Sequence, residues 1–237
     1  AKKYDINQFQ QLNKMVDSYV LLTAPMKEVV DIHNRPYIIL EGIVKTSELL
    51  MSYADTSNGV RKSILYAGAL YERYGVKTLI DSLTLIKDEG LKLVICGRGD
   101  LEDYIKNVAN KDPRIFYKGQ VTPEEVKELM NSVDLLVNPR PNNEIYTRYS
   151  FPSKNIEYLL SGKPVLGYKL DGMPECYRRF MTIVKEDSHT SAVENMAVAI
   201  QTALNQKEYS NALFISYAKE NLCADKVAVK IVDMLKS

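Results

Sequence analysis

Short apolar runs alternate with helical spacings of apolar residues from residue 63 to residue 204. The runs predict buried strands at 63–66, 91–96, 114–117, 134–137, 164–166 and 181–184. Apolar positions between them predict helices at 76–86, 101–108, 123–133, 153–161 and 192–204. This alternation predicts βαβ units, which right-handed crossovers arrange into a doubly wound, Rossmann-like α/β domain with a parallel sheet of about six strands.

The two ends of the chain do not follow this alternation. The first part predicts a polar helix at 5–16, strands at 18–22 and 36–40, and a short helix after Pro25. The tail predicts further helices. We therefore expect a Rossmann-like domain over 63–206, a partial second domain with a linker over 1–62, and C-terminal helices over 207–237 that pack back on the first part.

The loop before the helix at 153–161 carries the most candidate chemistry. Ligands bind doubly wound sheets outside the carboxyl ends of the strands, and this loop, 138–153, is longer than the usual two to six residues. The helix start offers free amides, the Ser153 hydroxyl and the Lys154 ammonium, a competent anion site. Glu157 lies one turn further on the same face, placed to accept hydrogen bonds from a ribose. The alternative, a capping serine and a solvated glutamate, stays open on this segment alone.

Charge and cysteine content exclude several function classes. The 31 basic and 30 acidic residues give a net charge of +1, which excludes bulk attraction to nucleic acid or anionic lipid as the main function. The three cysteines are odd in number and far apart, which indicates a reducing compartment rather than a disulfide framework. The two histidines have no cysteine nearby, so no usual zinc site is expected.

Residues 150–165 resemble the core motif of retaining group 1 glycosyltransferases with the GT-B fold, in the variant common among bacterial surface-polysaccharide enzymes. Further segments match in the right order. They are the glycine-rich first turn at 65–75, the second strand and its turn at 93–100, the turn that contacts the base at 117–121, and the strand before the motif at 134–139. The resemblance covers about residues 17–235.

The resemblance implies a nucleotide-sugar donor bound in the C-terminal half of a two-domain enzyme. Residues 1–62 would then be a remnant of the N-terminal acceptor domain, and the isolated chain would not catalyse transfer alone. Glu157 matches the second acid of the family's Glu-x7-Glu motif, which holds the ribose. The first acid, which touches the transferred sugar, falls at Tyr149, so sugar recognition must differ. Glu144 substitutes for it only if the loop folds back.

The resemblance also implies that two usual cations are missing. Members of the family carry arginine after the first glycine and lysine before the second, and both grip the diphosphate. Those positions are Ala69 and Tyr74 here, and we expect Lys154 to replace the lost cations. Further candidates are Arg73, Arg140 and Arg148.

The predicted site combines these residues. Donor binding is expected from Gly68, Gly97, Arg98, Gly99, Val121, Tyr149, Ser150, Pro152, Ser153, Lys154 and Glu157, and catalysis from Lys154, Arg73 and Glu144. Because Glu102 stands at the third glycine position of the Gly97-x-Gly99 turn, no dinucleotide cofactor is expected. No cofactor and no metal are expected; the donor is a UDP-, GDP- or ADP-sugar.

The predicted function is transfer of a hexose or related sugar from a nucleotide diphosphate to a glycan or polyprenyl-linked acceptor, with retention of configuration, in surface-polysaccharide synthesis. Two alternatives stay open. Tyr149, Ala69 and Tyr74 favour a nucleotide-sugar-binding module without catalysis of its own, and a GT-B-shaped sugar-nucleotide epimerase is less similar over 149–165. We expect a cytoplasmic protein with no nucleic-acid partner, at the inner face of the membrane through peripheral association of its N-terminal part.

Overall fold

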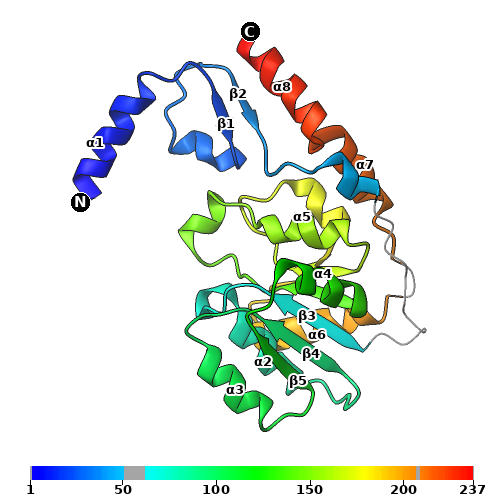
Figure 1. The fold of residues 1–237 in the computed structure, drawn as a ribbon. Helices are drawn as coiled ribbons and strands as arrows, with labels where there is room; N and C mark the ends of the chain where they lie inside the picture. The colour runs from blue at the N-terminus through cyan, green and yellow to red at the C-terminus, as the bar shows by residue number, and fades with distance from the viewer. Residues whose placement is uncertain (1, 51–61, 207–208, 237) are drawn as a thin grey trace.

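A six-stranded parallel sheet forms the centre of the chain (Figure 1). The computed structural model describes residues 2–50, 62–206 and 209–236. The strands are β3 (Ser63–Ala67), β4 (Lys92–Cys96), β5 (Ile115–Gly119), β6 (Leu135–Asn138), β7 (Val165–Gly167) and β8 (Thr182–Ile183). Their order is β5-β4-β3-β6-β7-β8, so the chain winds outward in both directions from β3 and β6. This confirms the predicted doubly wound class and places a topological switch point between the carboxyl ends of β3 and β6.

Helices cover both faces of this sheet. They are α2 (Val76–Leu83), α3 (Glu102–Ala109), α4 (Pro123–Ser132), α5 (Ser153–Leu160) and α6 (Ala192–Leu204), with short 3₁₀ helices η3 (Glu72–Tyr74), η4 (Ile145–Arg148) and η5 (Glu175–Arg179). Right-handed crossovers put helices from the two winding directions on opposite faces. Accordingly α2 contacts α6, and Figure 1 shows α4 on the other side of the sheet from α6.

The central strands are apolar at successive positions because both of their faces are covered. Ile64 and Leu65 of β3 and Leu135 and Leu136 of β6 are all fully buried. An alternating polar pattern would expose carboxylates or hydroxyls to this core, so continuous apolar runs are the expected signature of a buried parallel sheet.

Arg114 ties the start of β5 to the helix beside it. Its guanidinium donates to the carbonyl oxygens of Ile86 at 2.7 Å and Leu83 at 2.9 Å, and it pairs with the Asp112 carboxylate at 2.7 Å. The hydrogen bond from Arg114 holds the pKa of Asp112 below its usual value. The side chain thus satisfies the Ile86 carbonyl after α2 and adds a second donor to the Leu83 carbonyl, which also accepts from the Ile86 N–H at 3.1 Å.

We expect Arg114→Ala to lower the free energy of unfolding by about 2 kcal/mol, because it leaves the Ile86 carbonyl without this donor and removes the ion pair with Asp112. Urea denaturation at pH 7 measures the change, with the exposed Lys111→Ala as the control that should stay near wild type. Because the pKa of Asp112 is lowered by folding, the ion pair contributes above the unfolded pKa of about 3.9 and is lost as pH falls. A difference between wild type and variant that is as large at pH 3 as at pH 7 would contradict this assignment.

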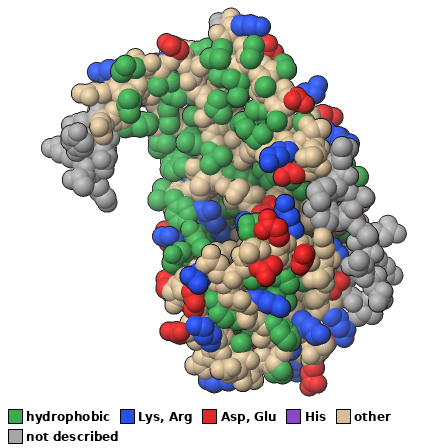
Figure 2. Space-filling model, in the orientation of Figure 1, with side chains coloured by type: hydrophobic (Ala, Val, Ile, Leu, Met, Phe, Trp, Pro, Cys, Tyr) green, Lys and Arg blue, Asp and Glu red, His purple; other side chains and the backbone are tan. Residues whose placement is uncertain are grey.

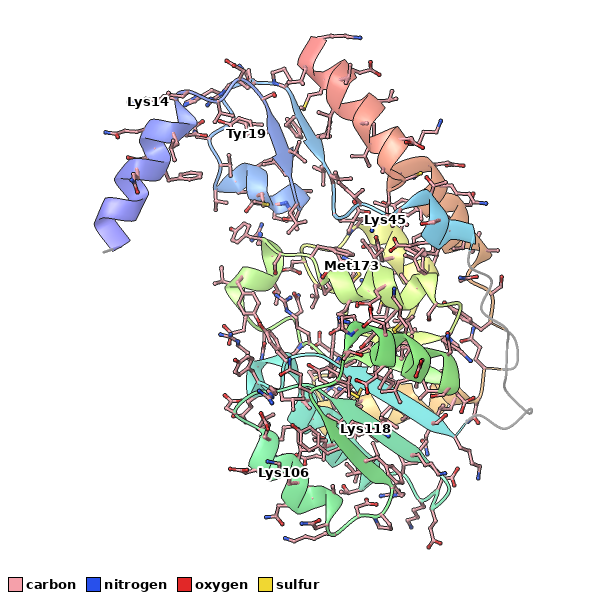
Figure 3. The ribbon with its side chains drawn as sticks, in the orientation of Figure 1. Lys14, Tyr19, Lys45, Lys106, Lys118 and Met173 are labelled. Carbon is pink, nitrogen blue, oxygen red and sulfur yellow. The ribbon has the colours of Figure 1, made fainter. Side chains whose placement is uncertain are left out.

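The N-terminal part carries a second, two-stranded sheet. It contains α1 (Lys2–Asn13), β1 (Tyr19–Leu21), η1 (Ala24–Glu28), β2 (Tyr37–Ile39) and η2 (Thr46–Leu50). β1 and β2 pair in parallel, and the guanidinium carbon of Arg35 lies 5.0 Å from the ring centroid of Tyr19. Figure 3 labels Tyr19 on β1. Val20 and Ile39 remain exposed, and Figure 2 shows hydrophobic side chains gathered over this end of the molecule.

The C-terminal helices α7 (Ala212–Asn221) and α8 (Ala224–Lys236) contact η2 and β2 of this N-terminal part. The Val44 N–H donates to the Leu222 oxygen at 2.8 Å, the Ala224 N–H donates to the Val44 oxygen at 3.1 Å, and α8 contacts β2. Among the described residues, no helix is long and apolar enough to cross a membrane.

Several predicted boundaries were wrong. The helix predicted at 5–16 runs over Lys2–Asn13. It ends there because the Arg35 guanidinium donates hydrogen bonds to the carbonyl oxygens of Asn13 and Val16. The two short strands keep only the three residues that pair with each other. The 138–153 loop contains η4, which the polar sequence did not indicate. Of the polar connection at 47–62, residues 51–61 lie outside the described part of the chain.

Candidate functional site at the switch point

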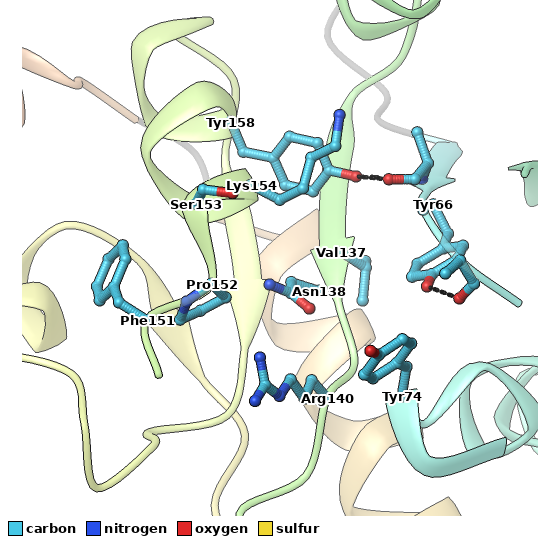
Figure 4. Close-up of a pocket in the computed structure, with 13 residues that line it drawn as sticks. Tyr66, Tyr74, Val137, Asn138, Arg140, Phe151, Pro152, Ser153, Lys154 and Tyr158 are labelled. Atoms are coloured by element: carbon cyan, nitrogen blue, oxygen red, sulfur yellow. Dashed lines mark hydrogen bonds between the residues drawn. The ribbon is translucent and has the colours of Figure 1, made fainter. Parts of the chain in front are cut away.

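Two adjoining cavities open at the carboxyl ends of the central strands. The β3–β6 cavity has a volume of about 220 Å³ and is lined by residues that include Tyr66, Tyr74, Asn138, Arg140, Ser153 and Tyr158 (Figure 4). The β4–β5 cavity has a volume of about 360 Å³ and is lined by residues that include Cys96, Gly97, Arg98, Gln120 and Val121. Both are lined by Ala67, Gly68, Ala69 and Lys154, so these residues form their junction.

Tyr158 keeps the β3–β6 cavity open. The ladder between β3 and β6 ends at Leu65 and Leu136, before the strand β3 itself ends. Beyond that point the Tyr158 hydroxyl accepts from the Ala67 N–H at 3.1 Å and donates to the Ala67 oxygen at 3.2 Å (Figure 4). The hydroxyl therefore replaces the missing strand partner, and the two strands can separate without leaving backbone groups unpaired. Burial raises the pKa of Tyr158, so the hydroxyl stays protonated and able to donate.

We expect Tyr158→Phe to lower the free energy of unfolding by about 1–3 kcal/mol, because it leaves the Ala67 N–H and oxygen unpaired in a buried place. Chemical denaturation measures the loss. Tyr71→Phe removes a hydroxyl from an exposed ring and should be close to neutral. Equal stability of the two variants would show that the Tyr158 hydroxyl does not support the strand end.

The N-terminus of α5 brings Lys154 to the junction of the cavities. Pro152, not Ser153, occupies the N-cap position, and no side chain caps this helix among the described residues. Ser153 therefore does not cap this helix; it lines the β3–β6 cavity. The Lys154 ammonium lies 2.7 Å from the Glu157 carboxylate, and both side chains are about 40% exposed (40% and 39%). The site therefore presents a helix N-terminus and an ammonium at one point.

Arg140 forms the opposite wall of the β3–β6 cavity. Its guanidinium carbon lies 4.5 Å from the ring centroid of Tyr146 and 5.9 Å from that of Tyr74. The Arg140 Nη2 donates to the Ser150 hydroxyl at 2.7 Å, and that hydroxyl donates to the Tyr146 oxygen at 2.9 Å. Figure 4 shows Arg140 and Tyr74 on the side of the cavity away from Lys154.

Seven of the predicted donor-binding residues line one of the two cavities: Gly68, Gly97, Arg98, Val121, Pro152, Ser153 and Lys154. The other four, Gly99, Tyr149, Ser150 and Glu157, do not. Gly99 lies against the backbone of Leu70, where an added Cβ would come within 2.4 Å of its oxygen. Ser150 accepts a hydrogen bond from the lining residue Arg140, and Glu157 forms an ion pair with the lining residue Lys154. Tyr149 ends η4.

The structure does not bring Arg73 and Glu144 to the cavities. Arg73 is exposed on η3 and stacks on the outer side of the tyrosine pair, 5.3 Å from the ring centroids of Tyr71 and Tyr74. Glu144 is exposed and precedes η4, which holds the loop in a compact turn, so the loop does not fold back. Arg148 pairs with Glu28 at 2.7 Å. Of the cations proposed to replace the family's pair, Lys154 and Arg140 line the cavity.

Sequence reasoning missed Tyr66, Asn138 and Gln120. Each lies at or just after the carboxyl end of a strand, which was the available signal. Asn138 donates to the buried Asn155 of α5 at 2.6 Å and so fixes that helix against β6. In the β4–β5 cavity, burial raises the pKa of the Cys96 thiol to about 11, so it stays protonated at neutral pH. No group of three or more His, Cys, Asp or Glu side chains suited to a metal occurs in the described ranges.

The sequence profile described as "Glycosyl transferases group 1" matches residues 61–206, more than half of the chain. The chain belongs to the group 1 glycosyltransferases. The matched segment contains all six strands of the parallel sheet and the residues that line both cavities. An uncharacterized glycosyltransferase of Methanocaldococcus jannaschii is 27% identical over 118 residues, which are 48% of this chain and 29% of that protein.

Solved glycosyltransferases share the fold of this group 1 chain. The pneumococcal O-GlcNAc transferase GtfA, in complex with UDP and GlcNAc, has a TM-score of 0.67 at 18% identity over 98% of this chain and 47% of GtfA. HepE of Anabaena, in complex with UDP and glucose, has a TM-score of 0.71 at 14% identity over all of this chain and 67% of HepE. The chain thus spans less than half of GtfA and 29% of the Methanocaldococcus protein.

Proposed function

We propose that this chain binds the nucleotide-sugar donor of a retaining glycosyltransferase. The observation that carries the proposal is the position of Lys154 and Gly68 at the junction of two cavities, beside the N-terminus of α5. A diphosphate at this junction would place its nucleoside in the β4–β5 cavity and its sugar in the β3–β6 cavity. The proximity of helix amides and an ammonium suits the two negative charges that the diphosphate carries.

The reaction we propose needs charge stabilisation above all. The bond between the anomeric carbon and the distal phosphate oxygen breaks, and its electron pair stays on the phosphate. The acceptor hydroxyl bonds to the anomeric carbon on the same face and gives its proton to the departing phosphate. Lys154 and the α5 amides stabilise the charge that develops, and such fixed charges are usually the largest contribution to catalysis.

Uridine is the first base to test. GtfA and HepE were solved with UDP, together with GlcNAc and glucose respectively. For this chain we propose a hexose or related sugar, a glycan or polyprenyl-linked acceptor, no required metal, and a role in surface-polysaccharide synthesis. Transfer that is lost in EDTA and restored by Mg²⁺ or Mn²⁺ would contradict the absence of a metal requirement.

Isothermal titration with UDP, GDP and ADP tests donor binding by this chain. Binding of at least one of them supports the proposal, and binding of none would contradict it. Transfer from a radiolabelled donor, measured with this chain and with any longer protein that contains it, then separates two candidates. The partial coverage of its relatives favours binding without catalysis by this chain alone. Conversion of the donor into an epimer would instead support the epimerase alternative.

Glu157 gives a sharper prediction about the nucleoside. We expect wild type to bind UDP several-fold more tightly than 2′-deoxy-UDP, because a carboxylate accepts from ribose hydroxyls, and we expect Glu157→Gln to reduce this preference. In the free chain the carboxylate pairs with Lys154, so the ribose would compete for it. An unchanged ribose preference in the variant would limit Glu157 to positioning the ammonium.

A further inference from the structure

Arg140 carries a charge that no carboxylate balances in the described part of the chain. It takes part in none of the ion pairs there, and its side chain is partly buried. Its guanidinium donates to the Ser150 hydroxyl, whereas the buried Nε finds no hydrogen-bond partner among the described residues. A cation removed from water without a counter-ion is costly, so a site that keeps one is suited to an incoming anion.

The surroundings of Arg140 hold the guanidinium in one place. The guanidinium carbon lies over the rings of Tyr146 and Tyr74, and Nη2 donates a hydrogen bond to the Ser150 hydroxyl. A guanidinium fixed in this way loses little conformational freedom when it binds, and its fork matches two oxygens of a phosphate. Tyr74, which stands where the family carries a lysine, thus helps to position an arginine from another loop.

The charges around the β3–β6 cavity show where the anion would lie. Its ionised lining residues are Lys154 and Arg140, and no Asp or Glu is among the described residues that line it. The charge of Lys154 is already opposed by Glu157 at 2.7 Å. Arg140 supplies the uncompensated charge, and it lines this cavity but not the β4–β5 cavity. The surplus positive charge is therefore on the side away from the proposed nucleoside position.

We propose that Arg140 binds the distal phosphate of the donor, the one that carries the sugar, and stabilises it as the leaving group. The inference rests on the proposed function, in which the phosphate next to the nucleoside lies at the junction beside Lys154. When the sugar bond breaks, the electron pair adds charge to the distal phosphate, and Arg140 opposes that charge. The preference for a diphosphate over a monophosphate then depends on the Arg140 side chain.

Calorimetry of the full chain with UMP and UDP tests this role. Wild type is expected to prefer UDP, and Arg140→Gln is expected to lose about 10- to 100-fold in UDP affinity while its UMP affinity stays within about twofold. Arg140→Lys keeps the charge without the fork or the stack, and we expect an intermediate loss. Arg178→Gln, which removes an exposed arginine outside both cavities, is the matched control with no change. If UDP does not bind, the same comparison is made with GMP and GDP, or with AMP and ADP.

The outcomes separate the two proposals. If wild type binds no nucleotide, the proposed function fails. If wild type prefers the diphosphate and Arg140→Gln keeps the full preference, or loses both affinities equally, the role of Arg140 is overturned while donor binding stands. An effect seen with UDP-glucuronic acid but not with UDP would assign Arg140 to a sugar carboxylate and also overturn it. Should Arg140→Gln fail to fold by circular dichroism, Arg140→Lys decides by the same comparison.

Discussion

Lys154→Ala is expected to weaken binding of UDP, or of whichever nucleoside diphosphate the chain binds, by about 10- to 100-fold. The side chain is the one cation that lines both cavities within the described residues, and it lies at the first turn of α5. Its removal takes away the charge-assisted hydrogen bond to the diphosphate. It also leaves the Glu157 carboxylate without its partner, so a negative charge then faces the phosphates. Isothermal titration at low and moderate salt measures both effects.

Two variants make this result specific. Lys154→Arg keeps the charge at the junction and should retain much of the affinity. Lys106→Ala removes an exposed lysine of α3 far from the cavities (Figure 3) and should bind as wild type does. Because Lys154 is about 40% exposed, the thermal stability of Lys154→Ala should change little. Wild-type affinity in Lys154→Ala would remove the ammonium from the anion site.

Lys154 and its helix were predictable because the relevant information is local. A proline and a serine before an apolar helical pattern indicate a helix start, and a lysine at the second position must then lie at its positive end. The sheet was predictable for the same reason, since each buried strand is a continuous apolar run. Local sequence therefore sufficed for the fold class and for one half of the site.

The Arg140 wall was not predictable in the same way. Arg73 and Arg140 both stack on Tyr74, one from outside the cavity and one from within it. Which arginine lines the cavity depends on how η3 packs against the loop after β6, and these two segments are far apart in the chain. Likewise the partner of the Ala67 backbone is Tyr158, 91 residues away. Such contacts follow from tertiary packing, on which periodicity carries no information.

Gly97→Ala is expected to abolish nucleotide binding and to lower the free energy of unfolding by about 3 kcal/mol or more. Gly97 has a φ of 139°, and an added Cβ would lie 1.8 Å from the Gly68 oxygen. Neither atom can move alone, because the Gly68 N–H donates to the Cys96 oxygen at 3.0 Å and the Gly97 N–H donates to the Gly119 oxygen at 2.8 Å. The substitution must therefore separate the turn after β3, which forms part of the junction of the two cavities, from the turn after β4, which lines the β4–β5 cavity.

Gly119→Ala is the control because Gly119 also has a positive φ but its added Cβ would collide with nothing. Its φ is 71°, but an added Cβ would meet nothing within 4 Å, so only the left-handed conformation adds a cost, of about 1–2 kcal/mol. Urea denaturation and titration with a nucleoside diphosphate compare the two variants. If both lose stability equally and both still bind nucleotide, backbone strain alone explains Gly97. If only Gly97→Ala loses binding, the close approach of the β3 and β4 turns is what shapes the donor site.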